Sequence, residues 1–215
     1  MKEIFFVADI ETSGAIPGDH EMLTMGCQVV ADGTVQKGQD FYAALKWTAK
    51  NQDGDTMEWW ADIHTKTKLG TEAYLEAFIR EPRYEPREAM IRFDQWVKDE
   101  LRQFDAKHAV FVSRPTGFDF TFVRWYLTHF VGSCIFGHRA LDLRSLWMGR
   151  IKGSGTFETP RPISEMGQPV AFSDLDSSKM DAAFGAGYVN PLPHHALEDA
   201  KALANAFVNV LSKVG

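Results

Sequence analysis

The stretch IFFVADIE, residues 4–11, decides how this chain folds, because an apolar run of strand length ends in it on two acidic residues. Short runs rich in β-branched and aromatic residues are typical of buried strands. Side chains two residues apart on a strand face the same side of the sheet. Asp9 and Glu11 are therefore expected to project together from the carboxyl end of a first strand, a spacing that suits shared metal ligands.

With 215 residues, of which 45% are hydrophobic, the chain is long enough for one buried core and short for two ordinary domains. We expect residues 1–215 to form a single domain. No apolar segment reaches the roughly 18 residues of a membrane span, and the first apolar run is too short for a signal peptide. Cys27 and Cys134 lack the spacing of a zinc knuckle or a redox pair. These features predict a cytoplasmic protein with reduced cysteines and no membrane contact.

The formal net charge of −6 argues against an ordinary nucleic-acid binder, because attraction to phosphate normally requires an excess of Lys and Arg. That argument weakens if several of the acids hold divalent cations. Bound cations cancel the acidic charge at their site and themselves attract phosphate. The composition therefore leaves a metal-dependent nuclease open.

Three strands are predicted in the first part of the chain, over residues 4–10, 23–30 and 38–42, with short turns between them. Consecutive strands joined by short turns form an antiparallel meander. Residues 55–101 then change to helical character, and we interpret them as a helical insertion.

The second half alternates strands and helices. Residues 109–112 are short, β-branched and apolar, which predicts a buried strand, and an aromatic helix is expected over 118–130. Residues 135–136 are interpreted as a fifth strand that leads into a helix near 141–149. A Gly-, Pro- and Ser-containing loop over 153–193 follows, with one short helix predicted near residues 175–184.

Two candidate catalytic residues, His194 and Asp199, lie five positions apart at the start of the last helix. Apolar residues recur at helical spacing from Ala196 to Leu211. Asp199 can turn toward the sheet and complete a metal site, while His194 can deprotonate a water, because imidazole has the side-chain pKa nearest physiological pH. The alternative is structural: His194 or His195 caps the helix, and Asp199 lies at the positive end of the helix dipole.

Asp119, within RPTGFDFTF at residues 114–122, stands at the head of a helix, where an acid is often a simple cap. Taken alone, Asp9 and Glu11 would likewise be two solvated acids at a strand end. Their order changes this interpretation, since acids on a first strand, a central helix and a last helix are what a two-metal phosphodiesterase assembles. Oxygen ligands without cysteine favour magnesium or manganese over zinc.

Together these motifs resemble those of the DEDD exonucleases, in the subgroup that carries a histidine in the third motif (DEDDh). The motifs are DIET at residues 9–12, GFDFTF at 117–122 and HHALEDA at 194–200. Their joint occurrence in this order is specific, even though each motif alone is not. The resemblance implies an RNase H-like α/β fold, with a mixed central sheet of about five strands and helices on both faces.

The resemblance also implies two Mg²⁺ or Mn²⁺ ions, roughly 3.5–4 Å apart on the scissile phosphate. It makes Asp9 the bridge between the ions and lets Glu11 and Asp199 hold the ion that activates water. Asp119 supports the second ion, and His194 is the general base. His195 stays an alternative to His194, because a shifted loop would exchange them. Glu198, next to Asp199, is expected to point elsewhere.

The implied activity is a 3′–5′ exonuclease that releases nucleoside 5′-monophosphates from single-stranded 3′ ends of DNA or RNA. Three further segments resemble phage exonuclease A-type enzymes: residues 55–60, 111–114 and 142–146. Thr12, Ser13 and Phe120 are candidates for binding the terminal nucleotide. Trp59 and Trp60 are available for stacking, although a Trp is more often a core residue.

Two other classes of function remain. The first is a non-catalytic nucleic-acid-binding or protein-binding module that retains the fold, and it is disfavoured because the motif residues are all present. The second is an RNase H-like endonuclease, which explains the clustered acids but gives no reason for the histidine. A homodimer is compatible with an exposed aromatic patch.

Overall fold

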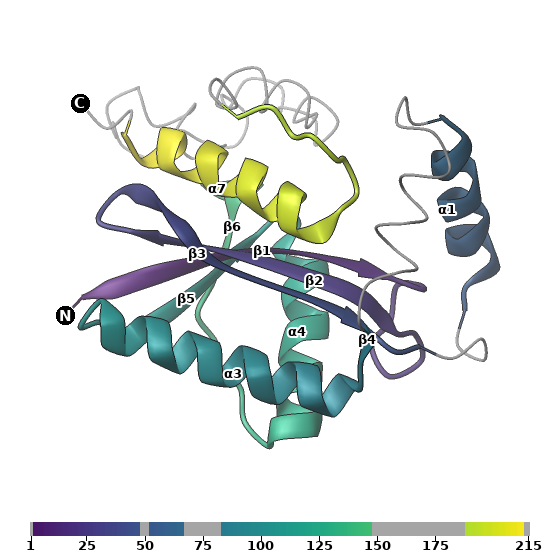
Figure 1. Ribbon diagram of the computed structural model, residues 1–215, viewed down its shortest axis with the longest axis horizontal. Helices are drawn as coiled ribbons and strands as arrows, with labels where there is room; N and C mark the ends of the chain where they lie inside the picture. Colours follow the sequence, from purple (N-terminus) through teal and green to yellow (C-terminus); the bar gives the residue numbers. More distant parts are fainter. Residues whose placement is uncertain (1, 48–51, 67–82, 148–187, 213–215) are drawn as a thin grey trace, which may run out of the picture.

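The computed structural model describes residues 2–47, 52–66, 83–147 and 188–212 of the chain. Within them, strands form one six-stranded mixed sheet in the order β4-β3-β2-β1-β5-β6 (Figure 1). The strands are β1 (Glu3–Thr12), β2 (Met22–Ala31), β3 (Thr34–Leu45), β4 (Arg83–Tyr84), β5 (His108–Ser113) and β6 (Ala140–Asp142). The helices are α1 (Gly54–Lys66), α3 (Pro86–Gln103), α4 (Thr116–Val131) and α7 (Ala196–Ser212).

Strand β1 lies inside the sheet between an antiparallel and a parallel neighbour. It pairs antiparallel with β2, which pairs antiparallel with β3, as the predicted meander requires. On its other side β1 pairs parallel with β5, which pairs parallel with β6. Because parallel strands end at the same edge of a sheet, the chain leaves β5 beside the acidic end of β1.

Helices cover both faces of the sheet, with α7 on one face and α3 and α4 on the other (Figure 1). Side chains of β1 alternate between the two layers. Phe6 and Ala8 belong to the apolar cluster packed against α3 and α4, whereas Val7 belongs to the cluster under α7. Continuing this alternation, Asp9 and Glu11 project on the face that α7 covers.

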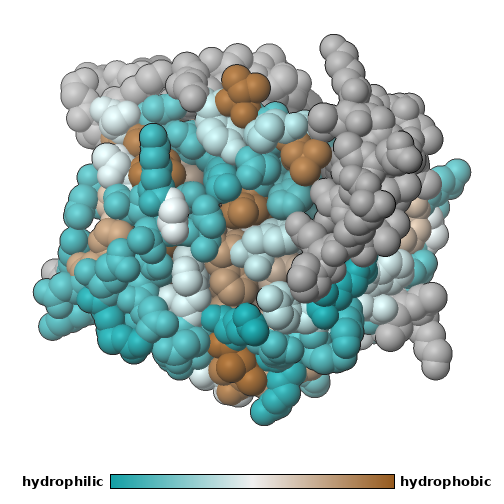
Figure 2. All heavy atoms as spheres, viewed as in Figure 1, coloured by the Kyte–Doolittle hydropathy of each residue, from teal (hydrophilic) through white to brown (hydrophobic). Residues whose placement is uncertain are grey.

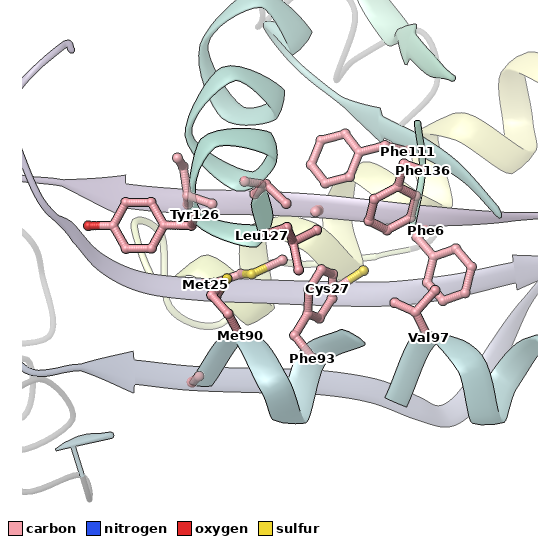
Figure 3. Close-up of a cluster of buried hydrophobic side chains, with 14 of the residues drawn as sticks. Phe6, Met25, Cys27, Met90, Phe93, Val97, Phe111, Tyr126, Leu127 and Phe136 are labelled. Atoms are coloured by element: carbon pink, nitrogen blue, oxygen red, sulfur yellow. The ribbon is translucent and has the colours of Figure 1, made fainter. Parts of the chain in front are cut away.

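Aromatic rings fill the layer between the sheet and α3 and α4 (Figure 3). Phe136 lies among them, with its ring centroid 5.6 Å from that of Phe6 and 5.4 Å from that of Phe111. Buried residues of α3 such as Phe93 and Val97 complete the layer (Figure 3). The outer surface of α3 is mainly hydrophilic (Figure 2), although Ile91 is exposed on it.

The strand predicted over residues 135–136 is wrong. These residues lie in turns, and Phe136 is fully buried because it fills the aromatic layer. A pair of apolar residues indicates burial but is too short to show periodicity. The strand at this edge is β6, which takes the first residues of the helix predicted near 141–149, and residues 143–147 are helical.

The prediction of a mixed sheet with helices on both faces is confirmed. The structure adds β4, a two-residue strand within the segment expected to be helical, and it pairs parallel with β3. The short helix predicted near residues 175–184 lies outside the described residues, as does most of the predicted loop over 153–193. Among the described helices, none combines the length and apolar character needed to cross a membrane.

Candidate active site

A glycine in β2 allows α7 to approach the acidic end of β1. Gly26 pairs with Asp9 in the sheet. A Cβ atom on Gly26 would lie 2.2 Å from the backbone nitrogen of Leu197 and 2.3 Å from the carbonyl carbon of Ala196. Real side chains do not approach backbone atoms so closely, so the first turn of α7 can rest on the sheet only where β2 has no side chain.

This contact delivers the third motif to the acids of β1. Potential ligand atoms of Glu11, His194 and Asp199 all lie within 4.8 Å of one another. Asp199 lies in the first turn of α7, and His194 precedes the helix with a φ of 65°. A left-handed backbone is uncommon for a residue with a side chain, so packing around this segment must hold His194 in place.

Asp119 reaches the same site from α4. It lies in the first turn of that helix and is 3% exposed. Its charge contributes to raising the pKa of both Asp9 and Glu11, so the three carboxylates interact electrostatically. Its Oδ2 atom is buried and accepts no hydrogen bond from the described residues. A buried carboxylate oxygen without a donor is the kind of group that a cation satisfies.

Burial is the largest cause that raises the pKa of all four carboxyl groups. For Asp9 and Glu11, burial raises the pKa well above its usual range, and the neighbouring acids raise it further. Burial also raises the pKa of Asp119 to about 7 and that of Asp199 to about 6. Arg114 opposes the shift at Asp9 and Asp199. Buried carboxylates in such proximity fit divalent cations, which would neutralise them.

The two adjacent histidines have different surroundings. The ring of His194 lies 5.2 Å from that of Trp59 in an edge-on arrangement, and burial lowers the pKa of His194. The ring of His195 stacks on Tyr42 of β3 at 4.6 Å, away from the cluster. Neutral imidazole is the form that accepts a proton. The geometry therefore favours His194 over His195 as the base.

Two hollows flank the cluster. One of about 530 Å³ is lined in part by Asp9, Arg114, Asn190, His194 and Asp199. The other, of about 250 Å³, is lined by Glu11 together with residues of the loop after β1, of α1 and of α4. Asp9 and Asp199 thus line one hollow and Glu11 lines the other, so the cluster borders both.

Known proteins share this architecture. No protein-family model matches the chain. Over 176 residues it is 28% identical to the 3′-5′ DNA exonuclease Cap18 of Escherichia coli, an alignment that covers 82% of this chain and 84% of the relative. The nuclease domain of 3′hExo, described as a DEDDh family member bound to rAMP, superposes with a TM-score of 0.62 at 14% identity, over 99% of this chain and 94% of that one. The chain has the fold of the DEDDh exonucleases.

The exonuclease I–ssDNA complex of E. coli shows the same DEDDh fold, with a TM-score of 0.59 at 13% identity. The match covers 99% of this chain and 41% of that one, so the chain spans less than half of exonuclease I. These similarities confirm the DEDDh resemblance and the RNase H-like architecture expected from the motifs.

Thr12 and Ser13, two of the residues expected to bind a terminal nucleotide, differ in their surroundings. Thr12 lines the smaller hollow, and its hydroxyl donates to the carbonyl of Gly14 at 2.8 Å. Ser13 is fully buried, and its hydroxyl accepts a hydrogen bond from the backbone nitrogen of Glu21 at 2.9 Å. The side chain of Ser13 therefore shapes the loop after β1.

Phe120, the third candidate for binding the terminal nucleotide, is partly buried and packs against the core. Its ring lies 5.1 Å from that of Phe111, in the aromatic layer of the core. Phe118 lines the smaller hollow instead. Successive residues of a helix are rotated by about 100°, so the two neighbours of Asp119 cannot face the same side. The hollow is also lined by Trp59, which is 46% exposed, and by Trp60, whose Nε1 donates to the carbonyl of Thr12 at 3.2 Å.

Three residues that shape or border the acidic cluster were not among the predicted site residues. Gly26 was marked only by being a glycine inside a strand, which often signals a close backbone approach. Asn190 donates from Nδ2 to Oδ1 of Asp199 at 2.6 Å, with no sequence signal. Arg114 lines the larger hollow, and its charge acts to lower the pKa of Asp9 and Asp199. Glu198, as expected, points elsewhere, toward Tyr188 and Lys201.

The raised pKa values predict how the metal-free protein responds to pH. The folded state binds protons at Asp119 and Asp199 more tightly than the unfolded state does, so stability falls as pH rises from about 4 through their folded pKa values of about 7 and about 6. Melting temperature measured in EDTA should therefore be higher at pH 5 than at pH 8. Asp119→Asn should flatten this dependence, and an unchanged slope would contradict it.

Proposed function

We propose that this protein is a metal-dependent 3′–5′ exonuclease that releases nucleoside 5′-monophosphates, with residues 1–215 forming one catalytic domain. The observation that carries this proposal is the convergence of partly buried carboxylates from β1 and α7 beside His194, with the buried Asp119 of α4 close enough to raise the pKa of Asp9 and Glu11. The similarity to a curated 3′-5′ DNA exonuclease supports nuclease activity. The structures that share the fold include one bound to rAMP and one bound to single-stranded DNA, which supports nucleic acid as the substrate.

We assign Asp9, Glu11, Asp119 and Asp199 to two Mg²⁺ or Mn²⁺ ions. When bound, these ions would supply the positive charge that activates water and stabilises the leaving 3′ oxygen. His194 accepts the proton of the attacking water at an imidazole nitrogen, and its lowered pKa keeps that nitrogen free near neutral pH. The edge of Trp59 lies against this ring and restricts its orientation.

The remaining residues of the site act on the substrate. Trp59, Trp60 and Phe118 surround the smaller hollow beside Glu11, so a terminal base can stack there. Arg114 places a positive charge in the larger hollow, next to Asp9 and Asp199. Once two divalent ions have neutralised four carboxylates, that guanidinium remains to attract the phosphate backbone.

Single-stranded DNA with a free 3′ end is the first substrate to test, because the curated relative is named as a DNA exonuclease. A 5′-labelled oligonucleotide, incubated with Mg²⁺ or Mn²⁺ one at a time, should shorten from its 3′ end and should be stable in EDTA. A closed circular single strand should resist. Cleavage of the circle would instead establish the endonuclease alternative, and binding without cleavage of either substrate would establish the non-catalytic one.

Replacing the two histidines separately tests the assignment of the base. His194→Ala should lower kcat by about 100- to 10,000-fold, the contribution typical of a general base. His195→Ala should lower the melting temperature, because it removes the stack on Tyr42, and should keep kcat within about tenfold of the unaltered protein. Equal losses of kcat in the two folded variants would contradict the assignment of His194 as the base.

A cytoplasmic location and a homodimer stay predictions from the sequence.

A further inference from the structure

Asn190 lies in the segment that leads into α7, outside all three motifs. It stands four residues before His194 and nine before Asp199. Its side chain is half-buried and lines the larger hollow together with both of these residues. A polar side chain at this place can act directly on the third motif.

The Asn190 amide makes two hydrogen bonds that leave one orientation. Its Oδ1 accepts from the backbone nitrogen of Leu192 at 2.9 Å, and its Nδ2 donates to Oδ1 of Asp199 at 2.6 Å. A backbone N–H can only donate, so the amide oxygen must face Leu192. The amide nitrogen therefore faces the carboxylate, which is the favourable pairing of a donor with a charged acceptor.

The two hydrogen bonds of Asn190 connect the segment that carries His194, the proposed base, with Asp199, a proposed metal ligand. The segment continues with a hydrogen bond from the backbone nitrogen of His195 to the carbonyl of Leu192 at 3.2 Å, and one from the nitrogen of Asp199 to the carbonyl of His195 at 3.0 Å. His194 lies inside this closed series in a left-handed conformation. Asn190 thus holds one carboxylate oxygen of Asp199 and also the turn that presents His194.

We propose that Asn190 is a positioning residue of the metal site. Through Asp199 it fixes the direction of a carboxylate ligand, and through Leu192 it stabilises the turn that carries His194. The amide nitrogen has no lone pair for a cation and the amide oxygen is occupied, so Asn190 acts only through these neighbours. Residues that hold metal ligands in this way are commonly worth 10- to 100-fold in metal affinity. The proposal rests on the proposed function of the same site.

Asn205 offers a matched control on the same helix. It is half-buried, and its Nδ2 donates to the backbone carbonyl of Lys201 at 2.8 Å, away from the cluster. Asn190→Ala and Asn205→Ala each remove an asparagine that makes an internal hydrogen bond. Calorimetric titration with Mn²⁺ should show affinity lowered by about 10- to 100-fold in Asn190→Ala and unchanged in Asn205→Ala.

The kinetic readout separates positioning from a general loss of folding. In Asn190→Ala, kcat at a fixed Mn²⁺ concentration should fall by about tenfold or more, while KM for the oligonucleotide stays within about threefold. Asn190→Leu, which keeps the branched shape of the side chain and removes its hydrogen-bonding groups, should show the same loss. It replaces the alanine variant if that variant does not fold. Unchanged Mn²⁺ affinity in a folded Asn190 variant, or an equal loss in Asn205→Ala, would overturn the proposal.

The calorimetry also distinguishes this proposal from the proposed function. If the unaltered protein binds Mn²⁺, Asn190→Ala weakens that binding and no nucleic acid is degraded, the exonuclease proposal fails and the positioning role stands. If the unaltered protein degrades DNA and Asn190→Ala binds Mn²⁺ as tightly as the unaltered protein, the exonuclease proposal stands and the positioning role fails. Absence of any Mn²⁺ binding by the unaltered protein would overturn both.

Discussion

Asp9→Asn is expected to lower kcat/KM for a single-stranded oligonucleotide by at least about 1,000-fold while raising the melting temperature of the metal-free protein. The activity falls because Asp9 is assigned as the ligand shared by both ions, and losing several kcal/mol of charge stabilisation in the transition state corresponds to a factor of this size. The stability rises because burial and the neighbouring carboxylates Asp119 and Asp199 disfavour the charged form of Asp9. A neutral amide of the same shape removes that repulsion.

The opposite signs of these two effects make the test specific. Asp32→Asn is the matched control, because Asp32 is an exposed acid in the turn after β2, paired with Lys2 at 3.2 Å. It should change neither activity nor Mn²⁺ affinity. Thermal unfolding in EDTA at pH 8, where the four carboxylates repel most, gives the stability comparison. A variant at Asp9 that loses activity and melts at a lower temperature would indicate damage to the fold, and an active one would refute the ligand assignment.

Gly26→Ala is expected to lower kcat/KM by about 100-fold without touching any residue assigned to the ions or the substrate. The added Cβ would lie 2.2 Å from the backbone of Leu197, so the start of α7 must move away from β2. That movement carries His194 and Asp199 away from Asp9 and Glu11, and a displacement of about 1 Å in a catalytic site can cost about 100-fold in rate. Overpacking should also cost about 1–3 kcal/mol of stability.

Gly54→Ala is the control for this change. Gly54 begins α1, and a Cβ there would meet no heavy atom of the described residues within 4 Å. It should leave activity and Mn²⁺ affinity unchanged, and alanine at a helix start should not lower the melting temperature. Calorimetry on Gly26→Ala should show weaker Mn²⁺ binding, since two proposed ligands come from opposite sides of the displaced contact. Full activity in a folded Gly26→Ala would show that α7 does not need this approach.

Divalent ions themselves should stabilise the unaltered protein against unfolding. Asp9→Asn and Gly26→Ala should reduce this stabilisation. At a Mn²⁺ concentration about 100 times its dissociation constant, ligand binding adds roughly 2.7 kcal/mol, which corresponds to about 5–10 °C for a chain of this size. Protons compete for the same carboxylates, so the shift should be smaller at pH 5 than at pH 8. A larger shift at pH 5 would contradict the assignment of these acids as ligands.

Local patterns along the chain were enough to predict much of this arrangement. The alternation in residues 4–11 predicted that Asp9 and Glu11 share one face of a strand, and the structure confirms it. The order of the motifs and the step from His194 to Asp199 indicated the family fold. These features follow from the periods of strands and helices, which are properties of neighbouring residues and need no knowledge of the rest of the molecule.

Only the tertiary structure decided which neighbours those faces meet. His195 differs from His194 because its ring stacks on Tyr42 in β3. Phe118 lines the smaller hollow, whereas the ring of Phe120 packs against Phe111 in the core. The roles of Gly26 and Asn190 likewise come from contacts with α7. The periodicity of a sequence predicts which side chains share a face of a strand or helix. It does not predict which other segment packs against that face. That partner is set by long-range packing, in which segments far apart in the sequence are brought together by burial of their apolar faces.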